Sequence, residues 1–184
     1  MASHKQRMLA GDSYLADDAE LVADRRRCRL LCEQLNSTSV TEPYAREEIL
    51  RALLGVIGDE TEIVSPFQCD YGYQVSVGAR SFINFGAVIL DSAPVQIGDD
   101  VQIGPGVQLV TPLHPLDPGD RRTRIEWARP IVIGDGVWLA AGAIICPGVT
   151  IGAGSVIGAG SIVTADMPER HLCFGNPCRP IRPV

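Results

Sequence analysis

The side chain in this sequence best suited to proton transfer is a histidine in a polar, proline-rich segment, residues 111–130. Of the three histidines, His4 lies near the start of the chain and His171 lies beyond the repeated region, so His114 is the best candidate for a general base. An imidazole can accept a proton from an attacking hydroxyl near neutral pH and pass it on. Glu126 in the same segment could orient the ring, although a backbone carbonyl would serve as well. The alternative is an ordinary surface histidine in a loop.

A six-residue repeat flanks this segment on both sides. An aliphatic residue, usually followed by a small one, recurs at Val77, Ile83, Ile89, Ile97, Ile103, Leu109, Ile133, Leu139, Ile145, Ile151, Ile157 and Val163. Six residues cover roughly 20 Å of strand and turn, which is one side of a triangular coil. A helix would not tolerate glycine at this spacing, and hairpins would place their turns farther apart. The repeat therefore predicts a mainly β fold, a parallel β-helix of hexapeptide repeats, from which residues 111–130 are extruded as a loop.

The first part of the chain has a helical period instead. Leu21, Cys28, Leu31, Cys32 and Leu35 form one apolar stripe, and a second helix is expected from about Pro43 to Gly55. Neither helix could form a core alone. We therefore expect a small N-terminal helical cap, residues 1–58, resting on a β-helix over residues 59–184 that ends in a C-terminal tail.

Composition and charge exclude several function classes. Apolar residues make up 46% of the chain, charged residues 21%, and the formal net charge is −6, so no nucleic-acid partner is expected. The run Arg25-Arg26-Arg27 reads as a solvated helix face. No signal peptide is evident, and the apolar stretch 137–149 is too short to span a membrane. Six cysteines without CxxC pairs predict reduced thiols and a cytoplasmic location.

Several motifs together identify a family. The hexapeptide array is joined by Cys69-Asp70-Tyr71-Gly72, by the loop His114-Pro115-Leu116-Asp117-Pro118 and by the ending Gly175-Asn176-Pro177-Cys178-Arg179. With the opening Met8-Leu9-Ala10-Gly11, these resemble the maltose and galactoside O-acetyltransferases over nearly the whole chain. The resemblance implies a left-handed β-helix, acetyl-CoA as acetyl donor, and a homotrimer with active sites between subunits.

The resemblance also implies roles for individual residues. His114 would be the base. Polar side chains would line the acceptor pocket: Asp70, Asn84, Asp91, and Asp17 or Asp18. The backbone N–H of Ala141 would hold the oxyanion, and acetyl-CoA would run past Trp138, Ala159 and Thr164 to Arg179 and Arg182. No metal is expected. Several of these roles have a structural alternative: a corner position for Asn84, helix capping for Asp17 and Asp18, packing for Trp138, and a solvated tail for the two arginines.

Three positions depart from the family pattern. Gly86 replaces a hydrogen-bonding residue, Ile83 replaces a small one and is expected to add bulk near the acceptor pocket, and Ala165 replaces a lysine expected near CoA. The leading hypothesis is an O-acetyltransferase for a sugar or a similar hydroxylated small molecule. A non-sugar acceptor, such as an antibiotic or serine, and a non-catalytic β-helix scaffold are the alternatives. A zinc carbonic anhydrase on this fold would need three histidines in the repeats, where only His114 lies close.

Overall fold

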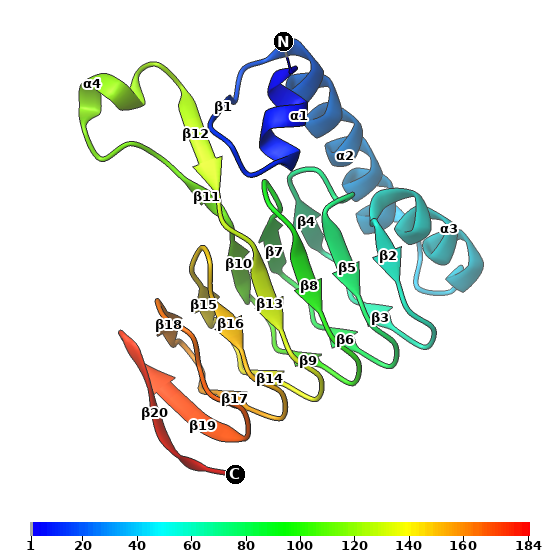
Figure 1. Ribbon diagram of the computed structural model, residues 1–184. Helices are drawn as coiled ribbons and strands as arrows, with labels where there is room; N and C mark the ends of the chain where they lie inside the picture. Colours follow the sequence, from blue (N-terminus) through cyan, green and yellow to red (C-terminus); the bar gives the residue numbers. More distant parts are fainter. Residues whose placement is uncertain (1) are drawn as a thin grey trace.

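The repeated aliphatic residues lie in short strands that stack into three parallel sheets, the faces of a triangular prism (Figure 1). This computed structural model describes residues 2–184. The first face contains β2 (Val56–Ile57), β5 (Val75–Val77), β8 (Val95–Ile97), β13 (Ile131–Ile133) and β16 (Thr150–Ile151). The second contains β3 (Glu62–Ile63), β6 (Phe82–Ile83), β9 (Gln102–Ile103), β14 (Trp138–Leu139), β17 (Val156–Ile157), β19 (His171–Gly175) and β20 (Cys178–Pro183). The third contains β4 (Phe67–Cys69), β7 (Ala87–Leu90), β10 (Gln108–Val110), β15 (Ile144–Ile145) and β18 (Ile162–Val163).

The core is a set of aliphatic ladders along the prism axis. Ile83 pairs in register with Ile63 below it and Ile103 above it, and all three are buried. The predicted left-handed parallel β-helix is confirmed. The expectation that Ile83 adds bulk to the acceptor pocket is wrong, because its side chain points into the prism. Gly86 is explained by its backbone: its φ of +77° lies in the left-handed region, where a side chain would be strained.

Three helices form the cap: α1 (His4–Leu9), α2 (Ala19–Ser37) and α3 (Pro43–Leu53). Asp18 caps α2 by accepting a hydrogen bond from the Glu20 N–H, as the capping alternative predicted. The buried residues of α2 are Leu21, Cys28, Cys32 and Leu35. The first coil begins at β2, a few residues ahead of the boundary expected at residue 59. The sequence did not indicate this start, because the strands before Val75 lack the regular six-residue spacing.

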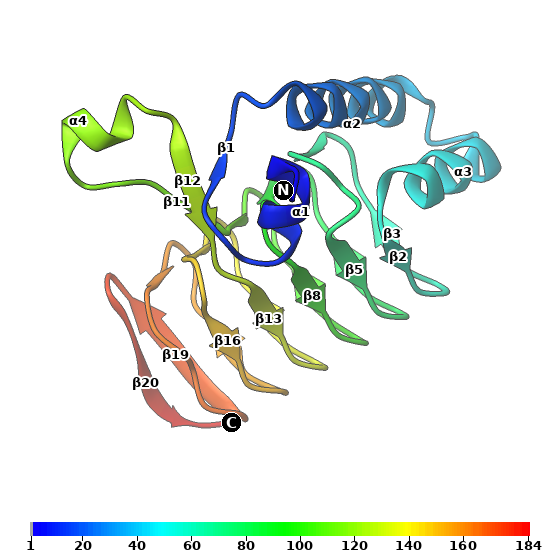
Figure 2. The same cartoon turned by 45° about the horizontal axis from the view of Figure 1, so that its top comes forward.

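The extruded loop contains secondary structure that its composition did not predict. It consists of β11 (Pro112–Leu113), the short helix α4 (Pro118–Arg121) and β12 (Ile125–Ala128). A strand of the cap, β1 (Tyr14–Leu15), pairs with β12 to complete a small antiparallel sheet in the order β1-β12-β11 (Figure 2). The cap and the loop are therefore joined by backbone hydrogen bonds.

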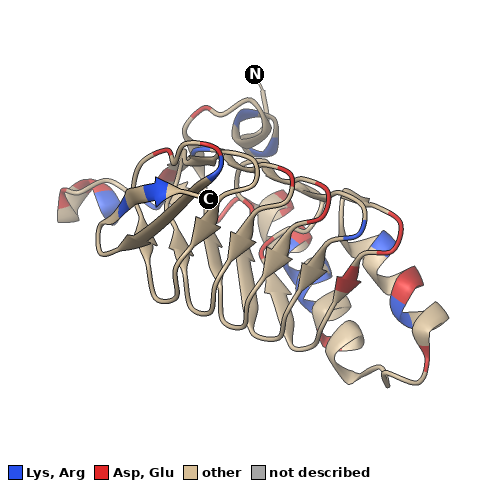
Figure 3. Ribbon diagram, turned by 90° about the horizontal axis from the view of Figure 1, so that it is seen from below, with Lys and Arg blue, Asp and Glu red and all other residues tan. Residues whose placement is uncertain are grey.

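The C-terminal residues form a hairpin, where a tail was expected. Strand β19 continues the second face beside β17, and β20 folds back on β19 in antiparallel pairing. Figure 3 shows charged residues gathered on the helices, on β20 and at turns along one edge, while the strands of the prism carry few. Within residues 2–184, none of the helices combines the length and hydrophobicity that crossing a membrane requires.

Candidate active site

The extruded loop and the cap bring His114 and Glu126 together. His114 follows β11 and Glu126 lies in β12, so the pairing of these two strands places their side chains beside each other. Nδ1 of His114 lies 3.4 Å from Oε2 of Glu126. The other carboxylate oxygen of Glu126 accepts a hydrogen bond from the hydroxyl of Tyr14, which pairs with Glu126 across β1 and β12. Tyr14 is buried, and the burial raises its pKa, so this hydroxyl stays protonated as a donor.

This chain of contacts determines which nitrogen of the imidazole is free. A carboxylate oxygen beside Nδ1 can only accept a hydrogen bond, which favours the tautomer that carries the proton on that nitrogen. Nε2 of His114 then has its lone pair available to a substrate. The His114 side chain is 55% exposed, whereas that of Glu126 is 12% exposed. The arrangement can therefore offer a base to solvent while its orienting carboxylate stays sheltered.

Two hollows meet at His114. The first, the cap hollow, has a volume of about 260 Å³ and is lined by Arg25, Arg29, Asp70, Tyr71 and Ser92 together with His114 and Glu126. The second, the loop hollow, has a volume of about 280 Å³ and is lined by Asp17, Arg121 and Arg124 together with His114 and Glu126. Of the predicted acceptor residues, the structure thus places Asp70 and Asp17 beside the histidine. Asp17 is paired with Arg124 of the loop rather than capping a helix.

Arg25 was not predicted to take part in a site, and the expectation of a solvated helix face is wrong for it. Its guanidinium donates to the Tyr71 hydroxyl at 2.6 Å and to the Ala16 carbonyl at 2.7 Å. Burial raises the pKa of Asp70, and the charge of Arg25 opposes that shift. Arg25 projects inward because it lies four residues after Leu21 and three before Cys28, on the side of α2 that is buried, whereas Arg26 and Arg27 are exposed.

Asp91 does not line either hollow. It is fully buried, and its carboxylate accepts the backbone N–H groups of Asp70, Tyr71 and Gln74 at 3.1, 2.8 and 3.3 Å. These bonds hold the turn after β4 in shape. The side chain of Asn84 likewise has a local partner, because its Oδ1 accepts the N–H of Phe85 at 2.8 Å at a prism corner. Both contacts support structural roles within a single chain.

The residues expected to hold acetyl-CoA lie at a different corner of the prism. Ala141 and Ala159 are exposed at successive coils of the corner between the second and third faces, the same corner at which Asn84 lies two coils below Ala141. Trp138 is exposed on β14 of the second face. The loop bearing His114 leaves from the corner between the third and first faces. Over residues 2–184 the N–H of Ala141 donates no hydrogen bond. It is therefore free to bind an oxyanion.

The remaining predicted residues lie at the loop corner and on the C-terminal hairpin. Thr164 follows β18 and is exposed at the corner from which the His114 loop leaves. Arg179 and Arg182 are exposed on β20, where, among the residues that the structure describes, their guanidinium groups donate only to the carbonyls of Cys178 and Pro183. Their charge is therefore available to a phosphate-bearing ligand.

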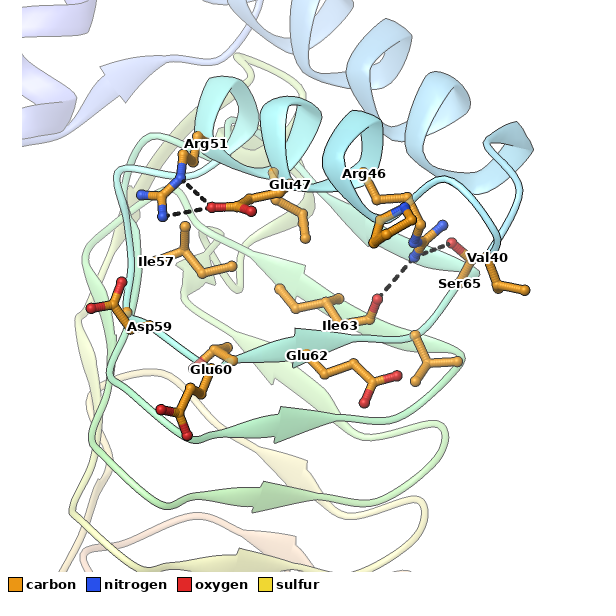
Figure 4. Close-up of a pocket in the computed structure, with 15 residues that line it drawn as sticks. Val40, Arg46, Glu47, Arg51, Ile57, Asp59, Glu60, Glu62, Ile63 and Ser65 are labelled. Atoms are coloured by element: carbon orange, nitrogen blue, oxygen red, sulfur yellow. Dashed lines mark hydrogen bonds and ion pairs between the residues drawn. The ribbon is translucent and has the colours of Figure 1, made fainter.

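One further cavity contains none of the predicted residues. It has a volume of about 450 Å³ and lies between α3 and the first coil (Figure 4). Arg46 there donates to the Ile63 carbonyl and the Ser65 hydroxyl, and Arg51 pairs with Glu47. The Arg46 bonds join the cap to the first coil, whereas the Arg51–Glu47 pair lies within α3.

Comparison with known proteins agrees with this geometry. Residues 7–58 match the maltose acetyltransferase hexapeptide capping motif, and residues 130–165 match the bacterial transferase hexapeptide model of six repeats. The chain is 46% identical over 177 residues to nodulation protein L of Rhizobium meliloti, an alignment that covers 96% of this chain and 97% of that protein.

Solved structures are similar over the full length. A maltose O-acetyltransferase from Clostridium difficile superimposes with a TM-score of 0.97 at 43% identity, covering 100% of this chain and 98% of that one. A galactoside acetyltransferase in complex with coenzyme A gives a TM-score of 0.94 at 34% identity, covering 100% and 92%. The chain therefore belongs to the maltose and galactoside O-acetyltransferase family and is an acetyl-CoA-dependent acetyltransferase.

Proposed function

We propose that the chain transfers the acetyl group of acetyl-CoA directly to a hydroxyl of a sugar or a similar small molecule, with His114 as general base. The observation that carries this proposal is the contact of Nδ1 of His114 with Glu126, which is itself held by Tyr14, at the point where two polar hollows meet. A non-catalytic scaffold would have no need of such an arrangement around an exposed imidazole.

The reaction requires no covalent intermediate on the protein. Nε2 of His114 takes the proton of the acceptor hydroxyl as its oxygen bonds to the thioester carbon, and the carbonyl electron pair moves onto oxygen. The N–H of Ala141 stabilises this oxyanion. When the carbonyl re-forms, the C–S bond breaks, and the CoA sulfur takes the proton back from the imidazolium. The acetyl ester and the CoA thiol are the products.

The cap hollow is the proposed acceptor site. It offers a carboxylate on Asp70, guanidinium groups on Arg25 and Arg29, and a hydroxyl on Ser92 beside the base. Hydrogen-bond donors and acceptors so close together suit an acetyl-accepting molecule that carries several hydroxyls. Asp17 lies on the other side of His114 and would contact the part of the acceptor that extends toward the loop.

The complete site is proposed to form between copies of the chain, in a homotrimer. His114 and Thr164 belong to one corner of the prism, whereas Ala141 and Ala159 belong to another. One acetyl-CoA can meet both sets if the loop corner of one copy faces the other corner of its neighbour. Asn84, in line with Ala141 and Ala159, would then reach the acceptor from that neighbour. A three-fold head-to-tail contact closes such a ring. The six free cysteines support the proposed cytoplasmic location.

Release of the CoA thiol in the presence of a sugar panel tests the proposal. His114→Ala is expected to lower kcat by about 10²–10⁴ while thermal stability and CoA binding stay close to wild type. His171→Ala is the matched control, since it removes an imidazole from β19, and it should retain turnover. Wild-type turnover in His114→Ala would remove this residue from the mechanism.

Mixing two inactive variants tests the shared site. Chains carrying His114→Ala lack the base, and chains carrying Ala159→Arg have a bulky side chain in the proposed CoA path. After random reassembly in equal amounts, about one quarter of the sites should combine an intact base with an intact CoA corner, and activity should return to that level. No recovery in verified mixed assemblies would mean that each site lies within one chain.

A further inference from the structure

Three cysteine thiols meet beneath the cap, outside the site described above. Cys28 and Cys32 lie one turn apart on α2, and Cys69 ends β4 on the third face of the prism. Sγ of Cys69 lies 3.5 Å from Sγ of Cys28 and 3.9 Å from Sγ of Cys32. All three sulfurs lie within 4.8 Å of one another. This group is here called the thiol triad.

The spacing of the triad matches that of sulfurs bound to one metal ion. Metal–thiolate bonds are about 2.3 Å long, which places two sulfurs about 3.8 Å apart around a tetrahedral ion and about 4.0 Å apart around a trigonal planar one. The distances from Sγ of Cys69 to the other two sulfurs, 3.5 and 3.9 Å, already lie within a few tenths of an ångström of the tetrahedral value. Little movement is needed for the sulfurs to share one ion.

The backbone on both sides of Cys69 is held in place. Two residues before it, the amide of Asn36 on α2 donates to the Phe67 carbonyl at 3.0 Å and accepts the Phe67 N–H at 2.9 Å. Directly after it, the buried carboxylate of Asp91 accepts the N–H groups of the following turn. The Asn36 bonds hold β4 against α2, and the Asp91 bonds hold the turn after β4 against the next coil. A metal site depends on such bonds around its ligands, because they fix where the ligands lie.

The triad has an entry path and a limited number of ligands. Cys28 is fully buried, but Cys32 and Cys69 are 6% and 8% exposed and line a hollow of about 340 Å³ together with Arg29. Across residues 2–184, no further cysteine, histidine or carboxylate belongs to the group. Zinc in structural sites takes four ligands, whereas three thiolates suit a soft ion that accepts three.

We propose that the thiol triad binds a soft monovalent metal ion of the Cu⁺ class through three sulfur ligands. Each thiol that binds as a thiolate exchanges its S–H bond for a Cu–S bond and releases one proton to solvent. Neither copper nor sulfur changes oxidation state. Arg29 lines both the hollow beside the thiol triad and the cap hollow, so its charge lies next to both. Cys69 is followed directly by Asp70, which connects the metal site to the proposed acceptor site by a single peptide bond.

Competition with a coloured Cu⁺ chelator under anaerobic conditions tests the proposal without reference to activity. The reduced wild-type chain should withdraw one Cu⁺ per chain, and X-ray absorption should detect sulfur ligands alone, three in number. Cys28→Ala and Cys69→Ala should each weaken the apparent Cu⁺ affinity by more than about 100-fold, a larger loss than removal of an outer-shell group causes. Cys146→Ala, which removes a half-buried thiol outside the triad, should bind as wild type does.

Circular dichroism establishes that each variant is folded before it is titrated. If Cys69→Ala does not fold, Cys32→Ala takes its place, because that side chain lies on a helix at the edge of the hollow. Failure of the folded wild type to withdraw Cu⁺, or an equal loss in Cys146→Ala, would overturn the site. Zn²⁺ binding as tight as Cu⁺ binding, with a fourth ligand detected, would overturn the assignment to a three-coordinate ion.

Discussion

Replacing Glu126 by glutamine isolates the electrostatic part of the proposed mechanism. Glutamine has the shape of glutamate. With its amide oxygen toward Nδ1 of His114 and its amide NH2 donating to the Tyr14 hydroxyl, it keeps both contacts but carries no charge beside His114. The base becomes an imidazolium only as the reaction proceeds. The carboxylate therefore stabilises the transition state more than the ground state, so Glu126→Gln is expected to lower kcat and to leave the KM for acetyl-CoA unchanged.

The magnitude follows from the separation of 3.4 Å between the two side chains. Because more than half of the His114 side chain is exposed, an effective dielectric constant of about 40–80 applies, and the charge–charge energy is about 1.2–2.4 kcal/mol. Each 1.36 kcal/mol is a factor of ten in rate, so kcat should fall by about 8- to 60-fold. This loss is smaller than the one expected for His114→Ala, because the base itself remains.

The assay is CoA thiol release at saturating concentrations of both substrates. Glu48→Gln, which removes an exposed carboxylate from α3, is the matched control and should retain wild-type kcat. A change of less than about twofold in Glu126→Gln would refute the role of the carboxylate. A loss as large as that of His114→Ala would refute the electrostatic account, since charge alone cannot supply it at this distance and exposure.

Three further predictions concern the bond that holds Glu126 and the stability of the fold. Tyr14→Phe removes the hydrogen bond to Glu126, which is worth about 0.5–1.5 kcal/mol. The kcat should therefore fall about two- to twelvefold while the KM for acetyl-CoA stays constant. A fall in stability with unchanged kcat would contradict this. Burial raises the pKa of Asp91 to about 7, above about 3.9 in an unfolded chain, so the folded state holds a proton that the unfolded chain releases. The free energy of unfolding, measured with urea, should therefore decrease by about 2–3 kcal/mol as the pH rises from about 5 to about 8. Asp91→Asn should lack this dependence on pH. Gly152→Ala would place a Cβ 2.3 Å from the backbone nitrogen of Glu169, so its Tm should fall well below that of wild type; an unchanged Tm would mean that the coils separate easily.

The sequence predicted the fold because the six-residue period is local information. Each aliphatic residue of the repeat is followed within one turn by the residue that forms the corner, so the coil is specified without reference to distant parts of the chain. His114 was found for a related reason, since it lies where the period is interrupted and few other residues could move a proton. Asp18 as a helix cap is also a local feature.

Contacts between distant parts of the chain were decided by the tertiary structure. Tyr14 and Glu126 are 112 residues apart, and their hydrogen bond exists because a strand of the cap pairs with a strand of the loop. Cys28 and Cys69 meet across 41 residues for a similar reason, since α2 packs against β4. Asp91, expected in the acceptor pocket, is instead buried under a turn of the preceding coil.

The physical reason is the range of the interactions. A hexapeptide period, a cap or a glycine corner depends on neighbours a few residues away, and these are visible in sequence. The direction of Arg25 or the environment of Asp91 depends on which surfaces pack together. The burial of apolar area over the whole molecule decides which surfaces pack together. No single residue type or spacing in the sequence reports that burial.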